Sequence, residues 1–133
     1  MLEGGCNCGQ VRYRIEGQPV AVAQCHCNNC RRQSGSAFSV NLVVPKGAVT
    51  TSGDLACYVD GDTQSGNPVN RLFCPKCGSP ILSELTANPM VAVKAGTLHD
   101  PAPFAPGISL WNSTRLPWVE VAEGIACFER NPG

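Results

Sequence analysis

The chain has 133 residues, and its ten lysine and arginine residues balance its ten aspartate and glutamate residues. This balance excludes the strongly basic surface that nucleic-acid binding requires, so we expect no DNA or RNA partner. No stretch approaches the roughly 18 continuous apolar residues of a membrane-spanning helix, so we expect no membrane insertion. A chain of this length fits a single domain, which we take to span residues 1–133.

Short apolar runs separated by 14 glycines and 11 prolines predict a mainly β domain. The clearest strand covers residues 10–16, where Val11, Tyr13 and Ile15 alternate with charged residues. Further strands are predicted at 20–23, 38–44, 55–59, 69–73, 80–85, 90–95 and 118–121. Residues 28–34 are expected to form one helical turn at most, 99–107 an ordered loop, and the tail after Phe128 a loose end.

Nine cysteines, an odd number, would leave a pure disulfide framework with one unpaired thiol. The residues before Cys6 lack the charged and then apolar leader of a secretory signal, which favours a cytoplasmic protein. Clustered cysteines in the cytosol stay reduced and bind metal more often than they form disulfides. Metal binding is therefore the first interpretation of the cysteine pattern.

Two pairs of cysteines are separated by a single residue, Cys6 with Cys8 and Cys25 with Cys27. Residues i and i+2 of an extended backbone project to the same face, so both thiolates of such a pair can reach one ion. The intervening residue then points away. We therefore expect that His26 is not a ligand of the ion bound by its neighbours.

Residues 74–78 read Cys-Pro-Lys-Cys-Gly, the form of a zinc knuckle. Gly78 suits the positive φ that such a tight turn often needs. The two thiolates of Cys74 and Cys77, together with those of Cys6 and Cys8, would close a tetrahedral structural zinc site.

The remaining clustered cysteines are Cys25, Cys27 and Cys30. Three thiolates on one side of an ion leave an open position, which is how catalytic zinc sites are built. The adjacent Arg31 and Arg32 could offset the excess negative charge and bind an anionic substrate. We therefore expect two zinc ions per chain, the second of them catalytic.

Two alternatives remain open from the residues alone. A fourth ligand such as His99 or Cys57 could close the second site, which would make the chain a non-catalytic zinc-binding module for protein interactions. The cluster from Cys25 to Cys30 could also act as a redox sensor through labile thiols. Outside the clusters, Cys57 and Cys127 are expected to be small core residues.

Two tryptophans, Trp111 and Trp118, are expected mainly to pack, with a smaller chance that one lines a pocket.

The clusters and their flanking residues resemble, in order along the chain, the glutathione-dependent formaldehyde-activating enzyme family. The resemblance rests on residues 6–9 with Tyr13, on 25–32 and 35–38, on 73–79, and on 95–98 with Trp118. It implies an Mss4-like fold, with small antiparallel sheets around a zinc-clamped core. It also implies the same division into four structural and three catalytic zinc ligands.

The activity implied by the resemblance is a carbon–sulfur lyase reaction, in which glutathione and formaldehyde condense to S-hydroxymethylglutathione. The alternative is a reaction of the same type on a related thiol–carbonyl adduct. Glutathione carries carboxylates that need cationic partners. Beyond Arg31 and Arg32, the candidates are Arg71 and Arg115.

Overall fold

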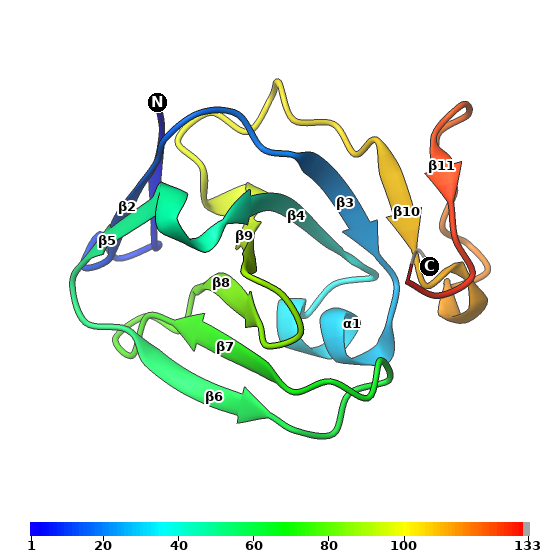
Figure 1. Cartoon of the computed structure of the whole chain (residues 1–133), viewed down its shortest axis with the longest axis horizontal. Coiled ribbons are helices and arrows are strands. Elements are labelled where there is room, and N and C mark those ends of the chain that lie inside the picture. The colour runs from blue at the N-terminus through cyan, green and yellow to red at the C-terminus, as the bar shows by residue number, and fades with distance from the viewer. Residues whose placement is uncertain (132–133) are drawn as a thin grey trace.

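The structure, a computed structural model, describes residues 1–131 and is built from two β-sheets (Figure 1). The small sheet has the order β1-β2-β5 and consists of β1 (Leu2–Gly5), β2 (Arg12–Ile15) and β5 (Val49–Ser52). The large sheet has the order β11-β10-β3-β4-β9-β8-β7-β6. This architecture confirms the mainly β fold that the short apolar runs predicted.

The strands of the large sheet are short, like the apolar runs from which most of them were predicted. Their bounds are β3 (Ala21–Cys25), β4 (Ser39–Pro45), β6 (Ala56–Asp60), β7 (Val69–Phe73), β8 (Pro80–Leu85), β9 (Met90–Lys94), β10 (Ile108–Leu110) and β11 (Ala126–Cys127). Strand pairs are antiparallel except around β10, which lies parallel to both β3 and β11. Single 3-10 turns are η1 (Lys46–Ala48), η2 (Ala95–Thr97) and η3 (Asn112–Thr114).

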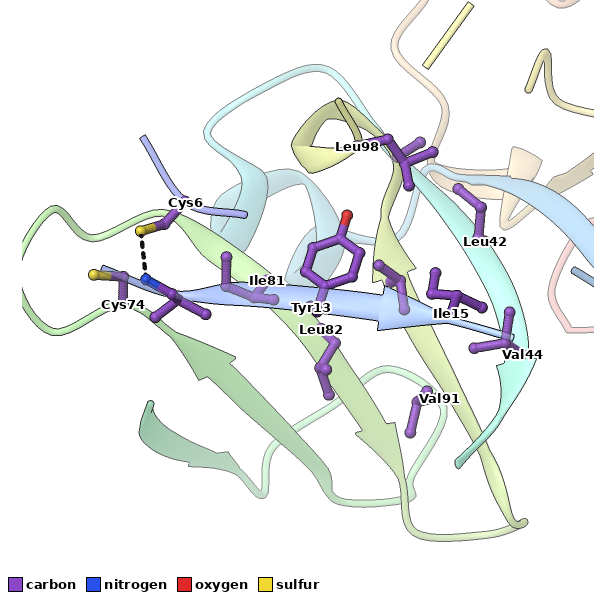
Figure 2. Close-up of a cluster of buried hydrophobic side chains, with 13 residues drawn as sticks. Cys6, Tyr13, Ile15, Leu42, Val44, Cys74, Ile81, Leu82, Val91 and Leu98 are labelled. Carbon is purple, nitrogen blue, oxygen red and sulfur yellow. Dashed lines mark hydrogen bonds between the residues drawn. The ribbon is translucent and has the colours of Figure 1, made fainter. Parts of the chain in front are cut away.

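The two faces of the large sheet have different chemistry because side chains alternate along each strand. On β4 and β9, Leu42, Val44, Val91 and Val93 belong to the apolar core, together with the buried face of β2. Figure 2 shows Tyr13 and Ile15 of β2 lying among these side chains. The residues that alternate with these along the strands, such as Asn41 and Lys94, line a cavity on the opposite face. The sheet therefore separates the core from the site.

Helix α1 (Asn28–Ser34) lies among the strands of the large sheet, with β3 and β4 above it and β6 and β7 below it in Figure 1. Its seven residues exceed the single turn that was predicted. The Sγ atom of Cys27 caps the helix by accepting a hydrogen bond from the Cys30 amide. Gly35 ends it with φ of 63°, and its amide donates to the Arg32 carbonyl. Two caps stabilise a helix that its own periodicity does not reveal.

Four further sequence predictions were wrong. Residues 118–121 form no strand, and Trp118 is 72% exposed rather than packed. Cys57 and Cys127 are exposed rather than in the core. The segment after Phe128 is hydrogen-bonded to the residues that follow β10, because the Trp111 amide donates to the Arg130 carbonyl. The two final residues of that predicted tail lie outside the described part of the chain.

The loop predicted at 99–107 is present, whereas β1, β5, β10 and β11 were not predicted. Among the described residues, none of the helices combines the length and the apolar character needed to cross a membrane.

At Gly4, the small sheet contacts the segment that follows β9. Gly4 pairs with Leu98, and a Cβ atom at Gly4 would overlap the Tyr13 hydroxyl and the Thr97 carbonyl oxygen. Tyr13 itself hydrogen-bonds Thr97 through its hydroxyl at 2.7 Å. Only a residue without a side chain fits at this contact.

We expect Gly4→Ala to lower the free energy of unfolding by about 1–3 kcal/mol, because the contact is overpacked. Urea unfolding of the metal-loaded protein measures this change. Gly61→Ala is the matched control, since a Cβ atom there meets nothing within 4 Å. A Gly4→Ala protein as stable as the control would contradict the close approach.

Candidate functional site

The first sulfur cluster joins the two sheets. Cys6 and Cys8 lie in the turn between β1 and β2, and Cys74 and Cys77 lie in the turn between β7 and β8. Figure 2 shows Cys6 and Cys74 converging from these two places. Backbone bonds shape the second turn: the Gly78 amide donates to the Cys74 carbonyl at 2.8 Å. The first pair sits in a turn, not on the extended backbone that the one-residue spacing was taken to indicate.

The geometry of this cluster fits a tetrahedral metal. The four ligand atoms all lie within 4.8 Å of one another. Cys6 Sγ is 3.6 Å from Cys8 Sγ, and Cys8 Sγ is 3.7 Å from Cys74 Sγ. A tetrahedron with zinc–sulfur bonds of about 2.3 Å has sulfurs about 3.8 Å apart, whereas a disulfide needs about 2.05 Å. The Val11 amide also donates to Cys6 Sγ at 3.2 Å, which orients that sulfur.

The second sulfur cluster forms where β3 runs into α1. Cys25 ends β3, Cys27 caps α1 and Cys30 lies in its first turn, with the three ligand atoms within 4.8 Å of one another. The Cys30 amide donates to Cys27 Sγ at 3.1 Å. Cys27 has extended backbone, so the side chain of His26 is directed away from the two cysteines beside it.

His26 is fully buried behind the cluster, and its ring packs at 5.3 Å from the Phe38 ring. Its Nε2 atom lies 3.1 Å from Ser109 Oγ, which donates its own proton to Asn112 Oδ1. Ser109 therefore accepts from His26, which fixes the neutral tautomer protonated at Nε2. His26 is buried behind the cluster and is not among its candidate ligands, in agreement with the prediction from the spacing.

The three thiols cannot all ionise without a nearby cation. Hydrogen bonds from Cys25 and Cys27 hold the pKa of Cys30 well below its ordinary value. Conversely, hydrogen bonds to Cys27 and Cys30, together with burial, raise the pKa of Cys25. One thiolate is thus stabilised at the expense of the others, and a bound dication would release the remaining protons.

A cavity of about 460 Å³ opens beside the second cluster. All three cysteines of the second cluster line it, and none of the four cysteines of the first cluster does. No other histidine, cysteine, aspartate or glutamate of the described residues joins the second cluster as a ligand. His99 lies instead in a separate depression beside Glu3 and Arg12, and Cys57 is exposed on β6. Neither residue is placed to close the second site.

The cavity floor carries two buried cations that the sequence analysis did not place together. Lys94 Nζ donates to Asn41 Oδ1 at 2.9 Å. Arg71 donates from Nε and Nη2 to Asp60 Oδ2 at 3.2 and 3.1 Å, and from Nη1 to Ser83 Oγ at 3.4 Å. These residues come from β4, β6, β7, β8 and β9, so only the sheet register brings them together.

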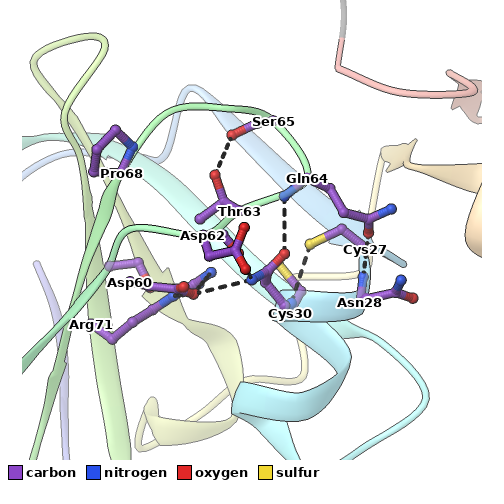
Figure 3. Close-up of polar contacts among 12 residues, drawn as sticks. Cys27, Asn28, Cys30, Asp60, Asp62, Thr63, Gln64, Ser65, Pro68 and Arg71 are labelled. Atoms are coloured by element: carbon purple, nitrogen blue, oxygen red, sulfur yellow. Dashed lines mark hydrogen bonds and ion pairs between the residues drawn. The ribbon is translucent and has the colours of Figure 1, made fainter.

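The loop between β6 and β7 forms part of the cavity rim by binding the start of α1 (Figure 3). Gln64 Oε1 accepts from the Asn28 amide, and the Gln64 amide donates to Asn29 Oδ1 at 3.1 Å. The Nδ2 group of Asn29 donates to the Asp62 carbonyl at 3.0 Å. These reciprocal bonds hold the loop against the helix that carries Cys30.

Trp111 lines the cavity and packs against Cys25 and Cys27. It is thus the tryptophan that lines a pocket, the alternative considered beside a packing role. Its Nε1 group donates to Asn131 Oδ1 at 2.9 Å. Arg130 also lies 5.8 Å from its ring centroid. The end of the described chain therefore positions one wall of the site.

The adjacent arginines Arg31 and Arg32 lie on α1 and are not among the residues that line the cavity. Their expected role in anion binding stays a prediction. Arg71, which the sequence offered only as a candidate, does line the cavity. A lysine, Lys94, was missed because nothing in its local sequence marks it as buried.

Comparison with known proteins gives a consistent result. The family described as glutathione-dependent formaldehyde-activating enzyme matches residues 1–114. A protein of Halomonas elongata, provisionally named a glutathione-dependent formaldehyde-activating enzyme, is 31% identical over 99% of this chain and 89% of its own length. A solved structure of a Rhodobacter sphaeroides protein superimposes with a TM-score of 0.59 at 20% identity, covering 76% of this chain and 93% of the other. That structural likeness concerns the fold alone.

We expect Cys74→Ser to remove one metal ion per chain and to abolish the cooperative unfolding transition. A closed metal site of this type binds with about 10 kcal/mol or more, which is available to folding only while the site is intact. Metal content by mass spectrometry and thermal unfolding measure the two effects. Cys57→Ser is the control, because Cys57 is exposed and lies outside both clusters. Equal metal content in the two variants would contradict the assignment of the first cluster.

Proposed function

Because the chain belongs to the glutathione-dependent formaldehyde-activating enzyme family, we propose that it is a zinc-dependent carbon–sulfur lyase. The proposed reaction is the condensation of glutathione with formaldehyde to S-hydroxymethylglutathione. The single observation that carries this proposal is the difference between the two sulfur clusters. The cluster of three cysteines lines the cavity, while the cluster of four does not.

We propose that the four sulfurs of Cys6, Cys8, Cys74 and Cys77 hold a structural zinc ion. This arrangement would staple the β1–β2 turn to the β7–β8 turn, across positions 66 residues apart in the chain. The staple would keep the small sheet against the core without taking part in the reaction.

Cys25, Cys27 and Cys30 would hold the catalytic zinc. When bound, this ion would supply a soft, electron-rich position at which a thiol loses its proton near neutral pH. The protein's own contribution is to keep three sulfurs on one side. Trp111 packs against Cys25 and Cys27, and the Cys30 amide donates to Cys27 Sγ, so these side chains have little freedom to change their orientation.

The cavity has room for a small thiol substrate. Its volume of about 460 Å³ falls within the usual range for ligand pockets. The residues that line it include Arg71, Lys94 and the side-chain amides of Asn29, Asn41 and Gln64. We keep Arg31 and Arg32 as proposed contacts for the glutathione carboxylates, and we propose that the enzyme is cytoplasmic.

The placement of Cys57 and His99 favours this enzyme over a closed zinc module. Both residues were the candidates for a fourth ligand, and both lie elsewhere. Among the residues from 1 to 131, the second cluster keeps three protein ligands. Three protein ligands with a position left open toward a cavity would be the arrangement of a reactive metal site.

We expect the wild-type protein to accelerate exchange between glutathione and S-hydroxymethylglutathione, measured by exchange NMR with formaldehyde present. Cys27→Ser should reduce this acceleration by at least about 10³-fold, because a lost ligand removes the metal environment on which the reaction depends. The fold should persist, since Cys27 lies outside the first cluster.

Cys127→Ser serves as the control for general loss of a thiol, because Cys127 is exposed and distant in chain from both clusters. A wild-type rate equal to the spontaneous rate would exclude this activity. Full activity in Cys27→Ser would exclude the assigned site.

A further inference from the structure

Lys94 is a buried cation on the cavity floor, and the proposed function gives it no role so far. It ends β9, is only 7% exposed and lines the same cavity as the three cysteines of the second cluster. A buried ammonium group is costly unless charge or hydrogen bonds compensate for its lost hydration. The buried ammonium group of Lys94 therefore needs a compensating interaction.

Lys94 does not use all of its hydrogen-bond donors within the described residues. A protonated lysine carries three N–H donors. Within residues 1–131, the hydrogen bond found for Lys94 Nζ is the one to Asn41 Oδ1, at 2.9 Å. Asn41 is itself held, because its Nδ2 group donates to Ser39 Oγ at 2.9 Å. The ammonium is thus fixed in place with donors left over beside the cavity.

The other buried cation, Arg71, differs in this respect. Asp60 neutralises it through two hydrogen bonds from Nε and Nη2, and Ser83 accepts a third from Nη1. Figure 3 shows the guanidinium directed at Asp60. The ion pairs of the described residues give Lys94 no such carboxylate. Of the two cations, Lys94 has the free donors.

Lys94 and the three cysteines of the second cluster line the same cavity, so their charges can balance one another. Burial lowers the pKa of Lys94, and the nearby charge of Cys30 acts in the opposite direction. Three thiolates with one dication carry a formal charge of −1, which one ammonium group offsets. The anionic centre and the cation thus face a common space, as a reacting pair of opposite polarity requires.

We propose that Lys94 is a catalytic residue that binds the carbonyl oxygen of the aldehyde through Nζ and stabilises the negative charge formed there. This inference rests on the proposed function. The thiolate sulfur of the substrate attacks the carbonyl carbon, a C–S bond forms, and the electron pair of the C=O π bond moves to the oxygen beside Lys94.

The step balances with water as the only other participant. The substrate thiol gives its proton to water when it becomes a thiolate, and the oxygen takes one proton from water to become the hydroxyl group of the product. Lys94 contributes hydrogen bonds and charge but no net proton. No oxidant or reductant is needed, because the thiol and the aldehyde together contain every atom of the adduct.

The test is Lys94→Met in the zinc-loaded protein, which keeps the length of the side chain and removes its charge and donors. We expect two zinc ions per chain and unchanged glutathione affinity, but an exchange rate lowered by about 10²-fold or more, as for loss of one donor to a developing oxyanion. Lys46→Met is the matched control, because Lys46 is exposed and paired with Glu84 at 2.8 Å. If Lys94→Met does not fold, Lys94→Gln replaces it.

A second measurement does not depend on turnover. Formate, a one-carbon oxyanion, should compete with formaldehyde, and the line of ¹³C-formate should broaden on addition of wild-type protein. Lys94→Met should weaken formate binding by about tenfold or more, as expected for a hydrogen bond to a charged group. Lys46→Met should bind formate as the wild type does.

The outcomes separate the two proposals. An active wild type with equally active Lys94→Met overturns the role of Lys94 alone. Loss of zinc from Lys94→Met would show that Lys94 merely balances the charge of the thiolates. Unchanged formate binding in Lys94→Met would show that Lys94 does not bind the carbonyl oxygen. Either result overturns this inference. A wild type without any acceleration overturns both this inference and the proposed function.

Discussion

Crowded sulfur atoms impose the constraint on which the rest of this molecule depends. Seven cysteines lie in two groups whose ligand atoms are all within 4.8 Å of their neighbours. Thiols this close cannot all lose their protons unless a cation balances the charge, and they are too far apart to be disulfides. Each group could therefore hold a metal ion, and the location of each group determines what a metal there could do. The first joins two turns of different sheets, whereas the second faces a cavity.

Alternation along the strands of the large sheet creates that cavity. Because neighbouring side chains point to opposite faces, Leu42 and Val44 of β4 and the valines of β9 belong to the core. Asn41 and Lys94, on the other face of the same strands, line the site. A rigid apolar core on one face can hold buried polar groups on the other with little freedom to move. The sheet is therefore both the scaffold of the protein and the floor of its site.

The proposed chemistry requires opposite charges at a short separation in a restricted volume. An electron-rich sulfur centre on one side suits a thiol, and an ammonium group on the floor suits the oxygen of a carbonyl compound. Arg71 is already neutralised by Asp60, and this pair shapes the floor. The division of roles between the two cations follows from their partners, since both are buried and both line the cavity.

The sequence alone determined the mainly β class, most strands of the large sheet, the grouping of the seven clustered cysteines and the family, because spacing within short motifs and alternation within short strands are local properties. Even there, the length of α1 was underestimated, since a cysteine cap and a C-terminal glycine add little periodicity. Only the tertiary structure decided that Trp111, Arg71 and Lys94 meet beside the second cluster. Their proximity arises from strand register between segments distant in the chain, including the parallel pairing of β10 with β3. Long-range pairing leaves no mark on the residues around a single lysine, so its burial could not be read from them.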